Sequence, residues 1–399
     1  MLLWSQYPGT TRQSKNTMTG QDRPTGASAQ GARAGVTLLG CGFVADLYMR
    51  SFKTFPHIQV FGAFDADPAR RTAFCAHWDI PALPDAAAAF ATGGLILNLT
   101  NPAAHESVIR QALDAGCNVF SEKPMVLDLE IAKALHAHAR EAGLQLASAP
   151  SSVLGEAAQT LGHALRDGTA GTPRLIYAEL DDGFIPQAPL EGWISESGAP
   201  WPYADEFRTG CTLEHAGYYL SWMIAHFGPI ARVVTAAAEI IPDKRGVTGT
   251  APDFSVATLY FASGPVARLT CSIAAPHDHR LRVIGDAGVL EVARAWDNAA
   301  PVRFRKRLRI RRRLLESPVS KRIRLAGRTH PHLPRKGAAA MNFALGPVEM
   351  LDAIAASKAS RLAGDYALHL TEVTLACQQT GLHEMTTSCT KMEPMPWAR

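Results

Sequence analysis

The stretch that decides the fold is Val36-Thr37-Leu38-Leu39-Gly40-Cys41-Gly42-Phe43-Val44-Ala45. Its first four residues predict a buried strand, and the residues after Gly42 begin a helical pattern. Gly40 permits a tight turn between the two, Gly42 lets a diphosphate approach the backbone, and Ala45 replaces the third glycine where helix meets strand. The turn therefore predicts dinucleotide binding, with contacts from Gly40, Gly42, Phe43 and Val44.

A carboxylate follows the turn at a suitable distance. Asp65 lies 25 residues beyond Gly40, at the end of the second predicted strand. There it can accept hydrogen bonds from the adenosine ribose hydroxyls, and it would repel a 2′-phosphate. We therefore expect NAD in preference to NADP, although Arg70 and Arg71 leave NADP open. The alternative interpretation is a glycine-rich turn with a helix-capping aspartate and no cofactor.

The chain around this turn alternates short apolar runs with helical repeats, a pattern typical of βαβ units and a parallel sheet. One helix is bounded clearly, because Asp128 can cap its start and Gly143 can close its end. We expect an α/β Rossmann domain with a doubly wound parallel sheet over residues 34–150, after a disordered leader over residues 1–33. Its predicted strands are Val36 to Leu39, Val60 to Asp65, Leu95 to Thr100, Asn118 to Ser121 and Leu144 to Ala147.

The order of predicted helices and strands changes beyond residue 150. Helices are predicted near 154–166 and 212–226, and two more near the end of the chain. Strand-like segments separated by tight turns must pair antiparallel, because a parallel return needs a dozen or more residues. Residues 151–399 therefore predict an α+β domain with a largely antiparallel open sheet. Its predicted strands are Arg174 to Leu180, Ala231 to Ile241, Phe254 to Phe261, Ala267 to Ile273, Leu281 to Ile284 and Val289 to Val292.

Composition limits the class of protein. The 399 residues are 47% apolar and 19% charged, which suits a folded protein of two domains. An uninterrupted apolar run long enough for a bilayer is missing from the sequence, and so is a secretory signal, so we expect a cytoplasmic protein without a membrane partner. The seven cysteines form no C-x-x-C pair, which indicates reduced thiols and neither a disulfide framework nor a cysteine zinc site.

Positive charge is concentrated in one segment. Residues 303–324 carry eleven Lys or Arg against one Glu, so the rest of the chain is acidic overall and nucleic-acid binding is not expected. Arg occupies every odd position from 303 to 311, which predicts a strand with one cationic face. We expect this face to meet solvent or another subunit, and binding of an acidic or nucleotide-linked sugar remains open.

Two histidine pairs could suggest a metal. His277 and His279 are two residues apart, as are His330 and His332. Neither pair has a helical i, i+4 spacing, a cysteine pair or a nearby carboxylate cluster in the sequence, so we expect loop histidines and no metal site.

Two further motifs follow the glycine turn. Asn98-Leu99-Thr100-Asn101-Pro102 precedes His105, and Ser121-Glu122-Lys123-Pro124 closes a later strand. With the glycines, in this order and on these strand ends, the chain resembles the glucose-fructose oxidoreductase, inositol dehydrogenase and MocA family from residue 34 to its end. The resemblance implies that Lys123 lies beside the nicotinamide and contacts the substrate oxygen, and that Glu122 helps to hold the nicotinamide ribose. It also implies cofactor contacts at Thr100, Asn101, Pro102 and His105.

A second family motif, commonly Gly-Gly-x-x-x-Asp-x-Gly-x-His, corresponds to residues 209–218. Here Glu214 takes the aspartate position and Tyr218 the histidine position. Some family members use tyrosine there, so Tyr218 is the implied proton donor or acceptor, and a neighbouring Lys123 should lower its pKa. His215 competes for this role, because it lies three residues from Tyr218 on a predicted helix. We favour Tyr218, since only Tyr218 keeps the family register.

A loop of residues 183–209 should select the substrate. Aromatic faces cover the C–H groups of a sugar ring while carboxylates and guanidinium bind its hydroxyls. The expected substrate contacts are Trp201, Lys123, Glu214 and Tyr218, and further candidates in the loop are Trp193, Tyr203, Glu206 and Arg208. An alternative is a loop that packs only on itself.

The resemblance implies an NAD(P)-dependent dehydrogenase of CH–OH groups, acting on a secondary alcohol or ketone of a sugar, cyclitol or related polyol. Two alternatives stay open, namely an NAD-dependent lyase or glycosidase that oxidises its substrate transiently, and a non-catalytic dinucleotide-binding regulator. We also expect a homo-oligomer, a dimer or tetramer formed through the C-terminal sheet.

Overall fold

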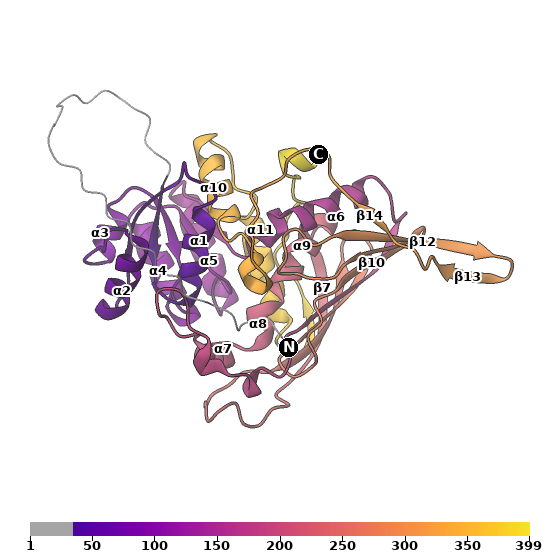
Figure 1. Ribbon diagram of the computed structural model, residues 1–399, viewed down its shortest axis with the longest axis horizontal. Helices are drawn as coiled ribbons and strands as arrows, with labels where there is room; N and C mark the ends of the chain where they lie inside the picture. The colour runs from indigo at the N-terminus through magenta and orange to yellow at the C-terminus, as the bar shows by residue number, and fades with distance from the viewer. Residues whose placement is uncertain (1–34) are drawn as a thin grey trace.

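The computed structural model describes residues 35–399, so the predicted leader lies outside the described residues. The N-terminal domain is built on a five-stranded parallel sheet with the order β2-β1-β3-β4-β5 (Figure 1). Each strand was expected from its apolar run, and the observed ends differ by one or two residues. The bounds are β1 Gly35–Leu39, β2 Gln59–Phe64, β3 Leu95–Asn98, β4 Val119–Ser121 and β5 Leu146–Ser148.

Helices connect these strands and cover both faces of the sheet. Asp67 caps α2, and Asp128 caps α5 by accepting a hydrogen bond from the Ile131 amide at 2.9 Å, as predicted. The strand order reverses between β1 and β3, which opens a crevice at the carboxyl ends of these two strands, where open α/β sheets bind ligands. The helices are α1 Phe43–Phe52, α2 Pro68–Trp78, α3 Ala86–Phe90, α4 Pro102–Asp114 and α5 Leu129–Glu141.

The C-terminal domain is built on a ten-stranded open sheet with the order β13-β12-β11-β10-β6-β9-β8-β7-β15, and β14 pairs with β12. Neighbouring strands are antiparallel except for β6 and β9, which are parallel because a long stretch with three helices separates them in the chain. The predicted largely antiparallel sheet is therefore confirmed. The bounds are β6 Pro173–Asp181, β7 Ile230–Ala238, β8 Phe254–Phe261, β9 Val266–Ser272, β10 Leu281–Gly285, β11 Gly288–Val292, β12 Val302–Ile310, β13 Arg313–Glu316, β14 Lys321–Ile323 and β15 Gly381–Glu384.

The helices of this domain lie on one side of the sheet, and α10 and α11 fill the space between the two domains (Figure 1). The helix predicted near 212–226 is two helices, α8 and α9, which meet at Ala216. No helix within residues 35–399 is long and apolar enough to cross a bilayer. The bounds are α6 Glu156–Arg166, α7 Tyr203–Thr209, α8 Cys211–His215, α9 Gly217–Phe227, α10 Leu345–Ala355 and α11 Asp365–Ala376.

The basic segment forms the predicted strand, and with β13 it makes a hairpin that extends away from the body (Figure 1). Arg307 pairs with Glu316 across the hairpin at 3.0 Å. None of the described residues of this hairpin lines the large cavity described below. The basic face is therefore not part of the wall of this cavity, and its binding of an acidic or nucleotide-linked sugar stays a prediction.

Buried histidines should make the fold sensitive to acid. Burial lowers the pKa of His136, His226 and His330 from 6.5 to about 4. The unfolded chain therefore takes up protons near pH 6.5 while the folded chain does not, so stability falls as pH drops from 7 to 5. Each histidine should contribute about 2 kcal/mol to this loss. In urea unfolding, His136→Gln should reduce the difference in free energy of unfolding between pH 7 and pH 5 by that amount.

The comparison variant is His138→Gln on the same helix, whose side chain is 31% exposed and lies 3.4 Å from Asp114. This substitution removes no buried imidazole, so it should not reduce the pH dependence as His136→Gln does. Equal behaviour of the two variants would contradict the argument.

Candidate active site

The glycine turn joins β1 to α1 at the carboxyl edge of the first sheet. Gly40 has φ +101°, and a Cβ on it would lie 2.5 Å from the Leu99 carbonyl oxygen, so the chain itself requires glycine there. Gly42 is different: its φ is −78°, and a Cβ on it would meet nothing within 4 Å. Gly42 is also the N-cap of α1 and has no side-chain cap. This open space at a helix start fits a diphosphate group.

Gly42→Val should therefore separate cofactor binding from folding. The new side chain has room in the protein alone, so stability should fall by no more than about 1 kcal/mol, the difference among N-cap residues. When a diphosphate is bound, the valine side chain would crowd it, which costs about 1–3 kcal/mol of binding free energy. The NAD dissociation constant should therefore rise roughly 10- to 100-fold. Titration of NAD by calorimetry and a thermal melt measure the two effects. In the comparison variant Gly40→Val, the main effect should be a loss of folding stability and not a loss of NAD affinity.

Asp65 lies beside this turn, and both of its oxygens bond the backbone. Oδ2 accepts from the Cys41 amide at 2.7 Å, and Oδ1 accepts from the Asp67 amide at 2.8 Å. Arg70, which lines the cavity, donates to the Cys41 carbonyl at 2.8 Å. Asp65 thus fixes the shape of the turn, and its contact with a ribose stays a prediction.

Two residues expected to touch the cofactor also build the framework behind it. Glu122 accepts hydrogen bonds from the Tyr48 hydroxyl at 2.7 Å and from the Lys123 amide at 3.0 Å. His105 is fully buried, and its two ring nitrogens lie 3.0 and 2.8 Å from the carbonyl oxygens of Thr100 and Pro124, one of which accepts a hydrogen bond from the ring N–H. His105 therefore corrects our expectation: its ring points inward and positions the two motifs, whereas Thr100, Asn101 and Pro102 line the cavity wall.

A cavity of about 1610 Å³ runs from the glycine turn into the C-terminal domain. Lys123 reaches into it from the first domain and forms an ion pair with Glu214 of α8. The Lys123 side chain is 19% exposed and the Glu214 side chain 5%. Burial disfavours the charged ammonium, but Glu214 and the other acidic groups around it outweigh burial, so the pKa of Lys123 lies well above its ordinary value. The amine is therefore held as a cation in the cavity.

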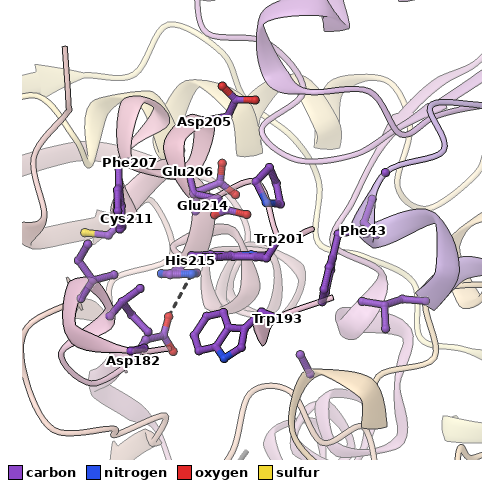
Figure 2. Close-up of a pocket in the computed structure, with 18 of the residues that line it drawn as sticks. Phe43, Asp182, Trp193, Trp201, Asp205, Glu206, Phe207, Cys211, Glu214 and His215 are labelled. Atoms are coloured by element: carbon purple, nitrogen blue, oxygen red, sulfur yellow. Dashed lines mark ion pairs between the residues drawn. The ribbon is translucent and has the colours of Figure 1, made fainter. Parts of the chain in front are cut away.

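A second carboxyl group lies beside this pair. Figure 2 shows the side chains of Glu206 and Glu214 next to each other, with Trp201 close by. Burial and the Glu214 carboxylate raise the pKa of Glu206 well above its ordinary value, and Lys123 offsets this only in part. The substrate end of the cavity thus holds more acidic than basic groups.

Tyr218 lines the same cavity and is 8% exposed. Burial raises the pKa of its phenol above the ordinary value, and the opposing effect of Lys123 is smaller. Our expectation that Lys123 lowers this pKa into a useful range is therefore wrong, because burial raises the pKa more than Lys123 lowers it. The phenol is a hydrogen-bond donor at neutral pH.

A third group surrounds Asp182, which follows β6. Its Oδ2 lies 3.0 Å from His215 Nε2, the pair joined by the dashed line in Figure 2, and its Oδ1 lies 2.6 Å from His279 Nε2. Burial lowers the pKa of His215, although Asp182 opposes this shift. Nδ1 of His215 has no hydrogen-bond partner among the described residues. The His279 ring packs on Trp296 with 4.4 Å between centroids.

The loop predicted to select the substrate divides into two parts. Trp193 and Trp201 line the cavity, and their ring centroids are 5.0 Å apart. Tyr203 and Arg208 lie outside the cavity wall: Tyr203 packs on Phe207, and Arg208 pairs with an acidic neighbour on α7. These two tryptophans are therefore the aromatic residues that the sequence predicted in this loop and that a substrate in the cavity could contact.

The same loop is fastened to the first domain. We call residues 194–200 the anchor loop, since a bridge between Ile194 and Pro200 closes it. Asp46 of α1 accepts hydrogen bonds from the amide and hydroxyl of Ser197 at 3.2 and 2.8 Å, and Arg50 of α1 pairs with Glu196. The anchor loop of the C-terminal domain thus contributes to the cavity wall and is bound to helix α1 of the N-terminal domain.

Comparison with known proteins agrees with this geometry. A family model described as an oxidoreductase family with an NAD-binding Rossmann fold matches residues 34–149, and the GFO/IDH/MocA C-terminal domain model matches residues 158–291. The chain belongs to the GFO/IDH/MocA family. The N-terminal domain of this GFO/IDH/MocA protein is therefore NAD-binding, and together the two models match more than half of the chain.

Relatives of this GFO/IDH/MocA protein include D-apiose dehydrogenase from Paraburkholderia graminis, 27% identical over 244 residues. That match covers 59% of this chain and 60% of the relative's length. UDP-N-acetylglucosamine 3-dehydrogenase from Acidithiobacillus ferrooxidans shares the fold with a TM-score of 0.65 at 20% identity, over 86% of this chain and 96% of that one. An inositol dehydrogenase homolog from Azotobacter vinelandii shares it with a TM-score of 0.67 at 16% identity, over 88% and 97%.

Sequence reasoning missed Asp182 and Trp296 in this GFO/IDH/MocA protein. Asp182 carried a usable signal, since it lies two residues beyond the predicted strand that ends at Leu180, and the loops that follow strands often carry functional residues. Trp296 carried none, because it lies in an irregular segment that only the tertiary fold brings to the cavity.

Proposed function

We propose that this GFO/IDH/MocA protein is an NAD-dependent dehydrogenase of CH–OH groups that interconverts a secondary alcohol and a ketone of a sugar, cyclitol or related polyol. The observation that carries the proposal is the placement of Lys123. Its ammonium enters, from the domain of the glycine turn, a cavity that the Glu214 and Tyr218 side chains of the other domain complete. Bound NAD supplies the hydride acceptor or donor at its nicotinamide ring.

The roles of the protein groups follow from their protonation. The Lys123 ammonium donates a hydrogen bond to the substrate oxygen and stabilises the negative charge that develops on it. The Tyr218 hydroxyl gives a proton to that oxygen during reduction and is left as a phenolate, and in the reverse direction the phenolate takes the proton from the alcohol during oxidation. Glu214 holds the ammonium in place. His215, held by Asp182, forms another part of the cavity wall, and we place it after Tyr218 as a candidate for proton transfer.

The charge of the cavity supports an uncharged substrate. Lys123 is already paired with Glu214, and Asp182 and Asp205 add acidic groups to the wall. A phosphorylated or carboxylated sugar would meet like charge in a partly desolvated site. The faces of Trp193 and Trp201 suit the C–H surface of a sugar ring. We therefore propose a neutral polyol over a nucleotide-linked sugar.

The test starts with the cofactor that copurifies with the protein, identified by mass spectrometry. The NAD-loaded protein is then mixed with panels of neutral sugars, cyclitols and nucleotide-linked sugars, and the absorbance of reduced nicotinamide is followed. Net reduction with a neutral polyol is expected. Product formation without net reduction would assign the transient-oxidation chemistry instead, and NAD binding without turnover on every panel would assign a regulator.

We also propose a homo-oligomer formed through the ten-stranded sheet, probed by sedimentation equilibrium. The outer face of the sheet carries stacked tyrosine and arginine side chains, the residues that dominate protein interfaces. Arg268 and Arg282 lie over the Tyr177 ring at 4.6 and 5.6 Å, and Arg232 lies over Tyr260 at 4.3 Å. A dimer or tetramer is expected, and a monomer at micromolar concentration would contradict the proposal.

The seven cysteines lie within the described residues and are free, which supports a reducing, cytoplasmic location.

A further inference from the structure

The pair His277 and His279 meets a carboxylate that the sequence places far away. Asp182 precedes the pair by nearly a hundred residues, and the lack of a carboxylate cluster near the pair in the sequence was one reason to expect loop histidines there. In the fold, the Asp181 amide donates to the Asp278 carbonyl at 3.0 Å, and the Asp278 amide donates to the Asp181 carbonyl at 2.9 Å. This backbone pairing holds the end of β6 against the histidine segment.

The three side chains converge. One ligand atom from each of Asp182, His277 and His279 lies within 4.8 Å of the other two. Alternate residues of an extended segment share a face, so both rings point the same way, and their centroids are 4.1 Å apart. We propose that Asp182, His277 and His279 bind a divalent transition-metal ion at the substrate end of the cavity.

The donor set decides the class of ion. Two imidazoles and one carboxylate suit zinc, manganese or iron, whereas magnesium and calcium prefer oxygen ligands alone. Three protein ligands leave coordination positions for other groups, and Asp182 and His277 both line the cavity. The ion would therefore bind hydroxyl groups of a polyol. This inference concerns ion binding and does not depend on the proposed hydride transfer.

The surroundings of Asp182 resemble those of a metal ligand. The Asp182 side chain is 5% exposed and the His279 side chain 1%, so two of the three ligands are held by packing. While Oδ1 faces His279, Oδ2 is held by Nε2 of His215 at 3.0 Å. A ligand carboxylate whose second oxygen is fixed by another side chain is the usual support of metal sites. His215 is thus a positioning residue for the ion.

The competing explanation is a purely structural carboxylate that accepts one hydrogen bond from each of two histidines. It needs His215 and His279 but not His277, whose side chain is exposed. His277→Ala therefore distinguishes the two explanations, and the exposed position makes loss of the fold avoidable.

The test uses the full-length protein after dialysis against a chelator, titrated with zinc in a calorimeter. We expect one equivalent of Zn²⁺ to bind, and His277→Ala to weaken its affinity by on the order of 100-fold, at least the effect of losing a supporting residue. Cobalt should give visible absorption bands in the parent protein that are lost in His277→Ala.

The matched control is His332→Ala. His332 belongs to the other His-x-His pair and also lies by a carboxylate, with Nε2 3.1 Å from Glu156. It should leave the zinc affinity unchanged. The proposal is overturned if zinc binding does not saturate, if His277→Ala binds zinc like the parent protein, or if His332→Ala removes the binding.

Discussion

Replacing Lys123 by Met should lower kcat/KM for hydride transfer by on the order of 1000-fold, because one preorganised donor to a developing alkoxide is worth about 10²- to 10³-fold. Methionine has a similar length but cannot donate a hydrogen bond or carry charge. The glycine turn is not altered, so NAD should still bind. Steady-state kinetics on the best polyol and an NAD titration measure the two expectations.

The single variant has a structural cost that must be separated from catalysis. Removal of Lys123 leaves the Glu214 carboxylate buried without its cation, which costs about 3–5 kcal/mol. The double variant Lys123→Met with Glu214→Gln removes the stranded charge and should recover stability without recovering turnover. Lys133→Met, which breaks an exposed ion pair with Glu130, should behave like the parent protein. Normal turnover by the double variant would refute the assigned role of Lys123.

Tyr218→Phe should lower kcat by about 10²- to 10⁴-fold, the range for loss of a general acid or base. It should also change the pH dependence. Burial raises the pKa of the phenol, so the phenolate that oxidation needs is scarce at neutral pH and grows about tenfold per pH unit. In the parent protein, polyol oxidation should therefore rise steadily from pH 7 to pH 10, while ketone reduction, which uses the protonated phenol, stays flat. The rise should disappear in Tyr218→Phe.

Two variants frame this result. Tyr219→Phe removes a buried hydroxyl that donates to the His279 carbonyl and does not reach the cavity, so it reports the effect of losing a phenol on the fold alone. His215→Ala removes the competing imidazole. If Tyr218→Phe turned over normally and His215→Ala were inactive, the proton would have to pass through His215.

The N-terminal domain was predictable because its determinants are local. The glycine turn, the cap at Asp128 and the apolar runs each act within about ten residues, so periodicity and spacing suffice. The C-terminal sheet was predictable in its hairpins, such as β8 with β9. The parallel pairing of β6 with β9 could not be predicted, since these two strands are far apart in the chain and no short sequence pattern encodes their pairing.

In the candidate site, too, residues in short local motifs could be predicted and long-range contacts could not. Lys123, Glu214 and Tyr218 were found because short motifs carry them, and the fold brings all three to one cavity. The sequence could not show that the His105 ring points away from that cavity. One short motif contains residues that line the cavity wall as well as residues that lie behind it, and the sequence does not distinguish them. Nor could it place Asp182 beside His279, since only the pairing of two distant strands does so.

The anchor loop has a mechanical consequence. Its two attachments to α1, through Asp46 and Arg50, tie the domains together in addition to the packing of α11 on α5. Widening the cleft by a hinge rotation has to break both attachments at once, one of them at a nearly buried arginine. We expect a small polyol to exchange while the loop stays fastened, and a dinucleotide to leave only after the loop detaches. Because each oxidation converts bound NAD to its reduced form, one turnover requires one exchange of coenzyme, and detachment of the loop should limit the steady-state rate.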